Sequence, residues 1–353
     1  MPKPKVLFIL KRRHDYNSEK HSNVNMSTGL YNSAFFMNEM INELGIKSEI
    51  VVVVDNNCID KEVTKYKPTH VIIEALWVVP DKFYVLTKLH PNVKWIIRLH
   101  SEIPFLANEG SAFNWLGDYM TYKNVIIATN APRTYKEMKF YLKHKLNCNS
   151  EIVENKVTYL PNYYPQQYID KKFNRNKEYI DICSFGAIRP LKNQLLQAIA
   201  AVKFAEKIGK KLRFHINSGR VEQKGNSVLK NMMSLFEHLY DEGHELINHE
   251  WMPREEFLEL CSKMDIGMQV SLSETFNIVG ADLVSQGIPL VASHEIPWAN
   301  SWFCSNPVDS EDMVRKLMFS YNFPKLNVLT NQYFLKSYTN KTKKIWKNYL
   351  LKK

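Results

Sequence analysis

A chain of 353 residues is long enough for about two domains, each with a core of its own. Hydrophobic residues make up 45% of it and charged residues 24%, which is typical of globular proteins and excludes a disordered chain. No apolar run reaches the roughly eighteen residues that a membrane-spanning helix needs, and the first ten residues turn polar too soon for a secretory signal.

Cysteine usage and charge indicate the cellular setting. The five cysteines are scattered, without the paired spacing of a zinc site, and their odd number favours reduced thiols. We therefore expect a cytoplasmic protein. The formal net charge of +11 favours an acidic partner, either nucleic acid or an anionic membrane surface. The alternative is that the lysines serve only solubility.

The first half of the chain alternates strands and helices. Lys5–Leu10 is an apolar strand, a polar loop follows over residues 11–28, and Leu30–Leu44 has the apolar spacing of a helix. Gly45 ends that helix, and Glu49–Val54 is the next buried strand, so the order is that of a βαβ unit. Further strands are predicted at His70–Leu76, Trp95–Leu99, Val125–Thr129 and Lys156–Leu160. The sequence thus predicts a doubly wound, Rossmann-like domain over residues 1–162.

The second half repeats the alternation after a break. Residues 163–178 are polar and lysine-rich, and we interpret them as a linker. The next domain is predicted to cover residues 179–330. Its strands are expected at Ile180–Phe185, Lys211–Ile216, Leu246–Glu250, Ile266–Val270 and Leu290–Ala292, and its helices at Gln194–Lys207, Arg254–Lys263 and Asn277–Gln286. Residues 331–353 have the pattern of an amphipathic helix from Tyr333 onward, with lysines on its other face.

Residues 266–293 carry the clearest functional signal. A strand runs into the polar turn from Ser271 to Glu274, a helix follows, and Gly287 can end that helix in a left-handed conformation. Ligands of open α/β sheets lie at the carboxyl ends of the strands, where a helix N-terminus favours phosphate. A carboxylate would repel phosphate, so Glu274 is better suited to neutral hydroxyls. A ligand that has both phosphate and hydroxyls is a nucleotide sugar. The alternative is that Glu274 merely caps a helix.

This segment resembles the signature of the retaining GT-B glycosyltransferases, the glycogen-synthase-like "glycosyl transferases group 1". Their pattern is Ser-x-x-Glu-Gly-Phe-Gly, a second Glu eight positions after the first, and then Gly-x-Pro-Val-Val-Ala. Seven residues match in order: Ser271, Glu274, Phe276, Gly287, Pro289, Val291 and Ala292. Thr275 and Asn277 stand where the family has glycines, and Asp282 stands where it has the second Glu.

A second resemblance lies between the first strand and the first helix of the second domain. The loop from Gly186 to Asn193 is similar to the family's Gly-Arg-x-x-x-x-Lys-Gly loop: Lys192 is in register, while Ala187 replaces the arginine and Arg189 lies close to its place. Fixed cations there can stabilise a departing diphosphate without a metal ion, and no Asp-x-Asp metal motif is evident. The alternative is ordinary surface charge at a helix start, although cations are unfavourable at that end of a helix.

The resemblance implies an α/β protein with the GT-B fold, in which two doubly wound Rossmann-like domains face a central cleft and the terminal helix packs back on the first domain. It implies a retaining, metal-independent hexosyl- or pentosyltransferase that needs no cofactor beyond its donor substrate, a nucleotide sugar such as a UDP-sugar. The expected catalytic residues are Glu274, Lys192, Arg189 and His100, a histidine that follows a strand of the first domain. The expected donor-binding residues are Gly186, Arg220, Thr275, Phe276, Asn277, Ile278 and Asp282. The expected acceptor-binding residues are Arg12, Arg13, His14, Ser27, Thr28 and Gly29. For His100, the alternative is a hydrogen-bonded core histidine.

The acceptor is inferred from charge. Basic residues gather in the loop 11–28 and in the terminal helix, and the chain looks like compact bacteriophage glycosyltransferases that modify their own DNA. This suggests double-stranded DNA with 5-hydroxymethylated pyrimidines as the acceptor, in the cytoplasm of a host. A bacterial surface lipid or polysaccharide, reached at an anionic membrane, is the main alternative. A nucleotide-sugar epimerase and a non-catalytic sugar- or DNA-binding relative are weaker alternatives.

Overall fold

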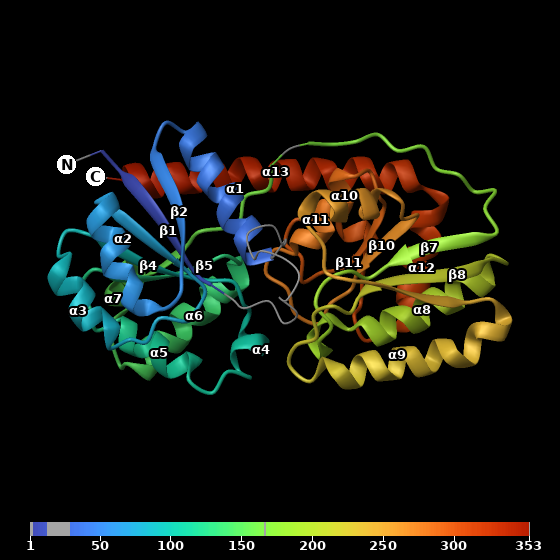
Figure 1. Ribbon diagram of the computed structural model, residues 1–353, viewed down its shortest axis with the longest axis horizontal. Helices are drawn as coiled ribbons and strands as arrows, with labels where there is room; N and C mark the ends of the chain where they lie inside the picture. The colour runs from blue at the N-terminus through green and yellow to red at the C-terminus, as the bar shows by residue number, and fades with distance from the viewer. Residues whose placement is uncertain (1–2, 13–28, 166, 353) are drawn as a thin grey trace. The chain divides into compact units, whose positions relative to one another are not determined.

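The computed structural model describes residues 3–12, 29–165 and 167–352. These residues form two compact units: residues 3–12, 29–165 and 339–352 make the first, and residues 167–338 make the second. Each unit has one six-stranded sheet, and helices pack around each sheet (Figure 1). All strand pairs in both sheets are parallel, so the predicted fold class, α/β with two doubly wound domains, is confirmed.

The first unit has the sheet order β2-β1-β3-β4-β5-β6. Its strands are β1 (Lys5–Lys11), β2 (Lys47–Val53), β3 (His70–Glu74), β4 (Lys94–Leu99), β5 (Val125–Thr129) and β6 (Val157–Tyr159). Its helices are α1 (Gly29–Glu43), α2 (Ile59–Tyr66), α3 (Lys82–Leu89), α4 (Ile103–Leu106), α5 (Ala112–Tyr119), α6 (Pro132–Lys145) and α7 (Ser150–Lys156), with a short 3-10 turn at Asn56–Cys58.

Apolar strands and amphipathic helices explain this arrangement. The residues from Val6 to Leu10 are all buried, as expected for a parallel strand covered on both faces. Helix α1 buries Met37, Met40 and Ile41, which lie three and four residues apart on one face. The core of the first unit therefore forms where the side chains of β1, β3 and β4 meet those of the helices.

The second unit has the sheet order β12-β11-β10-β7-β8-β9. Its strands are β7 (Tyr179–Cys183), β8 (Lys211–Asn217), β9 (Glu245–His249), β10 (Ile266–Gln269), β11 (Leu290–Ser293) and β12 (Cys304–Ser305). Its helices are α8 (Gln194–Lys207), α9 (Gly225–Leu239), α10 (Arg254–Ser262), α11 (Ile278–Ser285) and α12 (Ser310–Asn322), with short 3-10 turns at Pro190–Lys192, Tyr240–Glu242 and Ser301–Phe303. The chain reverses its progress across the sheet between β7 and β10, and such a switch point is where open α/β sheets bind ligands.

The terminal helix α13 (Pro324–Leu351) starts earlier than the sequence predicted. Its first turns bury Asn327 and Asn331, whose amides bond to the backbone of the second unit at Leu290 and Asn300. Buried polar residues hide the apolar periodicity on which the prediction relied. Helices α9 and α12 were not predicted at all. None of the described helices, α13 included, is long and apolar enough to cross a membrane.

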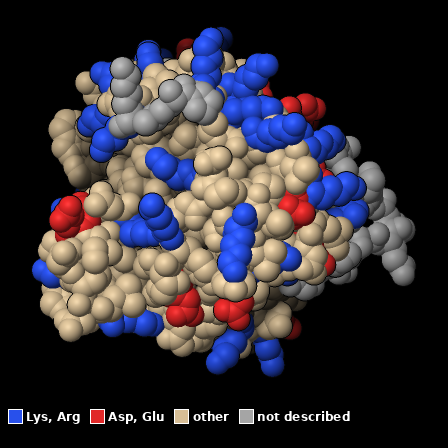
Figure 2. Space-filling view, turned by 90° about the vertical axis from the view of Figure 1, so that its left-hand side faces the viewer, with Lys and Arg blue, Asp and Glu red and all other residues tan. Residues whose placement is uncertain are grey.

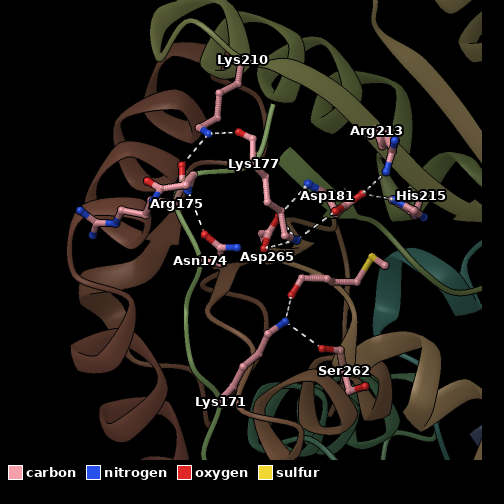
Figure 3. A network of polar contacts seen from close by, with 12 residues as sticks. Lys171, Asn174, Arg175, Lys177, Asp181, Lys210, Arg213, His215, Ser262 and Asp265 are labelled. Atoms are coloured by element: carbon pink, nitrogen blue, oxygen red, sulfur yellow. Dashed lines mark hydrogen bonds and ion pairs between the residues drawn. The ribbon is translucent and has the colours of Figure 1, made fainter. Parts of the chain in front are cut away.

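The segment that leads into β7 is anchored on the second unit (Figure 3). Lys171 Nζ donates a hydrogen bond to the carbonyl of Ser262 (2.8 Å) at the end of α10. Lys177 Nζ forms an ion pair with Asp265 (3.0 Å), just before β10. Residues 167–178, which the sequence predicted as part of a linker, are thus fixed to one unit along much of their length.

Candidate functional site

The loops after β7 and β10 meet at the switch point of the second sheet. The amide of Leu272 donates to the carbonyl of Leu191 (2.9 Å), and the side chain of Asn193 donates to the carbonyl of Val270 (3.1 Å). These bonds bring together the two loops that the sequence analysis singled out. Helix α11 begins at the same place, with its N-terminal amides at the carboxyl edge of the sheet.

Glu274 and Lys192 form an ion pair between these loops. Ser271 Oγ (2.9 Å) and Asn277 Nδ2 (3.1 Å) also donate hydrogen bonds to Glu274, and all three donors contact the same oxygen, Oε1. No described residue donates a hydrogen bond to Glu274 Oε2. The carboxylate is therefore held firmly by one oxygen, and the other can accept a hydroxyl group.

Asn277 explains how a non-glycine residue is accommodated in this turn. Its φ is 59°, in the left-handed region, where glycine is best suited and asparagine is among the more tolerant residues. Its Oδ1 accepts the amide of Gly280 (2.7 Å), and its Nδ2 also donates to Gln269 (2.8 Å). Asn277 thus keeps the backbone geometry that a glycine would allow, and it caps α11 as well.

The pKa of the Lys192 ammonium group is set by burial and by the charged side chains around it. Burial lowers the pKa of the Lys192 ammonium, the Glu274 carboxylate opposes this shift, and Arg189 adds to it. The side chain of Lys192 is 11% exposed and that of Glu274 is 8% exposed. A further anion placed beside Lys192 would strengthen its charged form.

Two arginines meet a carboxylate close to this pair. Arg189, in the loop after β7, contacts Glu222 (3.4 Å), and Arg220, in the loop after β8, donates through Nε to the same carboxylate (2.7 Å). The Arg220 guanidinium also lies over the ring of Trp251, at 5.5 Å from its centroid. The structure thus brings together the predicted residues Glu274, Lys192, Arg189 and Arg220 within the second unit, where Arg189 and Glu222 both act on Lys192 electrostatically.

The remaining donor-site predictions fall into two groups. Asp282 is buried in α11 and forms an ion pair with Arg254 (2.7 Å), so its predicted ribose contact stays a prediction. Phe276 is buried, its ring lies near Trp298 (6.1 Å), and its carbonyl accepts the Trp298 indole N–H (2.6 Å), which indicates a packing role. The others lie in the same two loops or at the start of α11: Gly186 with φ 113°, the buried Thr275, and the partly buried Ile278.

His100 lies in a polar cluster of the first unit, just after β4. Its Nε2 contacts the carboxylate of Glu74, which also accepts two hydrogen bonds from Arg98 (3.0 and 3.1 Å). Asn130 approaches the other ring nitrogen of His100 (3.4 Å), and Arg98 bonds to the side chain of Asn162. Burial would raise the pKa of Glu74, but Arg98 and His100 hold it below its usual value.

The terminal helix contributes to this cluster. Trp346 donates its indole N–H to the carbonyl of Pro161 (2.9 Å), and its ring lies 5.5 Å from the guanidinium carbon of Arg98. Thr342 donates to the carbonyl of Asn162 (3.2 Å). Side chains of α13 therefore cover the fully buried Arg98.

The acceptor predictions fall mostly outside the described residues. Arg13, His14, Ser27 and Thr28 lie there. Arg12 is exposed, and its amide donates to the carbonyl of Val53 (2.6 Å). Gly29 is the first residue of α1.

Sequence reasoning missed Glu74, Arg98, Glu222 and Arg254. Glu74 contacts both His100 and Arg98. Glu222 contacts Arg189, and Arg254 contacts Asp282. A charged residue at the end of an apolar strand, as Glu74 and Arg98 are, is a usable signal, because a buried charge needs a partner. No comparable signal marks Glu222, which occupies an ordinary loop.

One group of possible metal ligands is found among the described residues: Glu206, Glu242 and His244. It lies beside the amino end of β9, at the edge opposite to Glu274. His244 Nδ1 accepts the amide of Leu212 (3.0 Å), so the proton of the neutral ring is on Nε2. A ring nitrogen that carries a proton has no lone pair to offer, which does not suit a metal ligand.

Comparisons with known proteins identify the fold. No protein-family profile and no curated protein matches the sequence. Among solved structures, a UDP-forming α,α-trehalose-phosphate synthase from Burkholderia xenovorans is 14% identical, with a TM-score of 0.65 over 84% of this chain and 76% of that chain. The N-terminal domain of a Candida albicans trehalose-6-phosphate phosphatase is 13% identical, with a TM-score of 0.69 over 98% and 96%. An E. coli structure named for trehalose-6-phosphate, with UDP-2-fluoro glucose bound, is 10% identical, with a TM-score of 0.68 over 99% and 99%.

These structures share the GT-B fold, so this part of the prediction is confirmed. Their names differ, a synthase in one case and a phosphatase domain in another. The fold alone therefore does not determine the reaction, which has to be argued from the site.

Proposed function

We propose that this protein is a retaining, metal-independent glycosyltransferase that uses a nucleotide-sugar donor, namely a UDP-sugar. The observation that supports it best is the Lys192–Glu274 pair at the switch point, in which Glu274 keeps Oε2 available. A site that offers both cations and a carboxylate suits a ligand with both phosphates and hydroxyls. One similar structure has UDP-2-fluoro glucose bound, which agrees with this choice of donor.

The chemistry assigned to the site follows from charge. When the bond between the sugar and the diphosphate breaks, negative charge grows on the diphosphate, and Lys192 and Arg189 stabilise it. Glu274 accepts hydrogen bonds from the sugar hydroxyls and keeps the ring in place. The acceptor oxygen attacks from the face that the diphosphate leaves, so the anomeric configuration is retained.

The first domain supplies the acceptor side in this proposal. His100 is a catalytic residue of this domain, and Glu74 fixes the orientation of its ring. The second domain, residues 179–330, binds the donor through its two loops and through Asp282. Exchange of partners by Asp282 between Arg254 and the ribose is part of the same proposal.

For the acceptor, we propose 5-hydroxymethylated pyrimidines of double-stranded DNA. Residues 324–353 contain eight lysines and no aspartate or glutamate, so they carry most of the net charge of +11. Lys341, Lys344 and Lys347 are exposed, and no ion pair of the described residues involves them. Figure 2 shows one face of the molecule, where Lys and Arg side chains are more frequent than Asp and Glu and lie among uncharged atoms. Phosphate contacts by these lysines would make binding fall steeply with salt, and the target base would have to leave the stack.

The exposed lysines also support a second candidate acceptor, a bacterial surface lipid or polysaccharide intermediate. Lysines attract anionic headgroups as they attract DNA phosphates. Exposed Leu351 lies on the same helix end, and an apolar side chain beside lysines suits a membrane surface. The acceptor experiment below decides between the two.

The donor is tested first, without an acceptor. A panel of nucleotide sugars is screened for thermal stabilisation, because a ligand that binds only the folded state raises the melting temperature. We expect a UDP-sugar to stabilise the protein and slowly release UDP in the presence of EDTA. Interconversion of sugars instead would indicate an epimerase, and no effect of any nucleotide sugar would refute the proposal.

The acceptor is tested with a labelled donor. Duplex DNA with and without 5-hydroxymethylated pyrimidines, and a bacterial lipid extract, are offered separately at two salt concentrations. We expect label only on the hydroxymethylated DNA, less of it at the higher salt, and an α-linked product from an α-linked donor. Label on the lipid alone would assign the membrane acceptor, and an inverted product would exclude the retaining mechanism.

A further inference from the structure

Glu222 is placed by the backbone beside the arginines of the candidate donor site. The amide of Ile188 donates to the carbonyl of Arg220 (2.9 Å), and the amide of Glu222 donates to the carbonyl of Ile188 (2.9 Å). This short parallel bridge joins the loop after β7 to the loop after β8. Gly225 permits the close approach, because a Cβ at that position would lie 2.1 Å from the Ile188 carbonyl oxygen.

The side chain of Glu222 binds both arginines at once. Oε2 is 3.4 Å from Arg189 Nη1, and Oε1 accepts the Nε–H of Arg220 at 2.7 Å. The side chains of all three residues are only partly buried, with exposed fractions of 21% to 22%. Guanidinium groups that bind a carboxylate can bind phosphate oxygens with the same N–H donors.

This cluster belongs electrostatically to the Lys192–Glu274 site. The amide of Lys192 donates to the carbonyl of Arg189 (3.0 Å), so the two side chains start from the same turn. Arg189 lowers the pKa of Lys192, and Glu222 raises it. The site thus contains three cations, Arg189, Arg220 and Lys192, and two carboxylates, Glu222 and Glu274. The Glu274 side chain is 8% exposed, whereas the Glu222 side chain is 22% exposed and can turn toward solvent by rotation about its own bonds.

We infer that Glu222 is an internal counter-ion that occupies the diphosphate position between Arg189 and Arg220 until the donor displaces it. The inference rests on the proposed function, and it names the residue that sets the affinity of this site for diphosphates. When the diphosphate enters, it takes over the hydrogen bonds of the two guanidinium groups, and the Glu222 side chain turns toward solvent. When the nucleoside diphosphate leaves, Glu222 returns and prevents other anions from remaining bound.

A positioning role for Glu222 makes the opposite prediction. If the carboxylate served to hold the arginines in their binding geometry, its removal would weaken diphosphate binding. If it competes with the diphosphate, its removal strengthens binding. The direction of the change therefore distinguishes the two roles.

The test measures UDP and inorganic pyrophosphate binding by calorimetry at one fixed salt concentration. Wild type is compared with Glu222→Gln, which keeps the shape of the side chain, and with Glu222→Ala, which removes it. Glu237→Gln is the matched control, because this exposed residue of α9 has the same charge and lies in the same unit. We expect about three- to tenfold tighter binding of both probes by the two Glu222 variants, as for the loss of one partly exposed charge pair. The control should bind like wild type.

Equal or weaker binding by both Glu222 variants would overturn the inference while leaving the donor assignment intact. An equal gain in Glu237→Gln would also overturn it, since net charge alone would then explain the effect. If wild type binds pyrophosphate but no UDP, the choice of nucleotide is wrong. The pyrophosphate affinities of the Glu222 variants then still decide whether Glu222 competes with the anion. If no variant binds either probe, the inference and the proposed function fail together.

Discussion

Each unit places a buried carboxylate with a cation at the carboxyl edge of its sheet, but the two pairs are built differently. In the first unit, Glu74 and Arg98 are both 0% exposed, and both oxygens of Glu74 accept hydrogen bonds. In the second unit, Glu274 and Lys192 keep some exposure, and the described residues donate hydrogen bonds to only one oxygen of Glu274. A pair with every group satisfied suits a fixed scaffold, whereas a pair with a spare acceptor can bind a ligand. Under the proposed function, the first pair is the scaffold that holds His100, and the second pair contacts the donor.

Removing the charge of Glu274 is expected to have the largest effect. Glu274→Gln keeps the size of the side chain and loses the carboxylate that orients the sugar, so transfer should fall on the order of 10³-fold, as for other fixed groups of an active site. The rate is measured with saturating donor, and unfolding is followed in parallel. A variant that folds and transfers sugar at the wild-type rate would show that the second pair is no more functional than the first.

Breaking the pair of the first unit should lower stability. Arg98→Met leaves Glu74 charged and without its main partner in the interior, which costs about 3–5 kcal/mol of the free energy of unfolding. Urea unfolding of the single variant is compared with the double variant Glu74→Gln/Arg98→Met. The double variant should recover part of the loss, because no charge is then left buried. A loss below about 1 kcal/mol in the single variant would contradict the scaffold role.

Low pH should reduce the stability of both units through two histidines that lie outside these pairs. Burial and Lys94 lower the pKa of His70 to about 4, and burial and His215 lower that of His249 to about 4. Between pH 6.5 and 4, an unfolded chain takes up protons at these rings that the folded chain does not, so stability is complete above pH 6.5 and is lost as the pH falls toward 4. For the more buried His70 we expect about 2 kcal/mol, measured by urea unfolding at pH 7 and pH 4.5. His70→Gln should flatten this dependence, and an unchanged pH profile would disprove the assignment.

The smallest expected effect concerns Asn277, which supports the carboxylate of the second pair. Asn277→Gly preserves the left-handed backbone and loses the cap and the bond to Glu274, so we expect a cost of about 1 kcal/mol or less. Asn277→Ala loses the same bonds and adds strain at positive φ, for a further cost of about 1 kcal/mol. Thermal unfolding of the two variants measures the difference. Equal stability of glycine and alanine would show that the backbone geometry is not the reason for asparagine here.

The sequence was sufficient for the fold class and for most of the strands, and it named Lys192 and Glu274, which the structure brings together. Val125–Thr129 and Gln194–Lys207 were predicted to the residue, because an apolar run or a helical period crosses them without interruption. Gly287 has the left-handed φ, 73°, that the helix stop required. The order strand, acidic turn and helix placed Glu274 opposite Lys192, since both follow neighbouring strands at a switch point.

The features that the sequence did not predict depend on contacts between residues far apart in the chain, and such contacts leave no local sequence pattern. Gly287 is also required because a Cβ there would lie 2.5 Å from the carbonyl oxygen of Ile169, which is 118 positions earlier in the chain. The partnership of Arg254 with Asp282 and the bridge that places Glu222 are likewise long-range pairings. Periodicity and motif spacing describe one segment at a time, so pairings of this kind are visible only in the folded chain.

The contact between Trp346 and Arg98 affects the order in which the two units can be completed during synthesis. Residues 339–352, which include Thr342 and Trp346, complete the first unit, although they follow the whole second unit in the sequence. On the ribosome, the second unit is therefore available in full before the first one is. Domains usually fold in the order of their synthesis. Here the first unit can be completed only after the second unit has been made, because the segment that covers Arg98 is synthesised last.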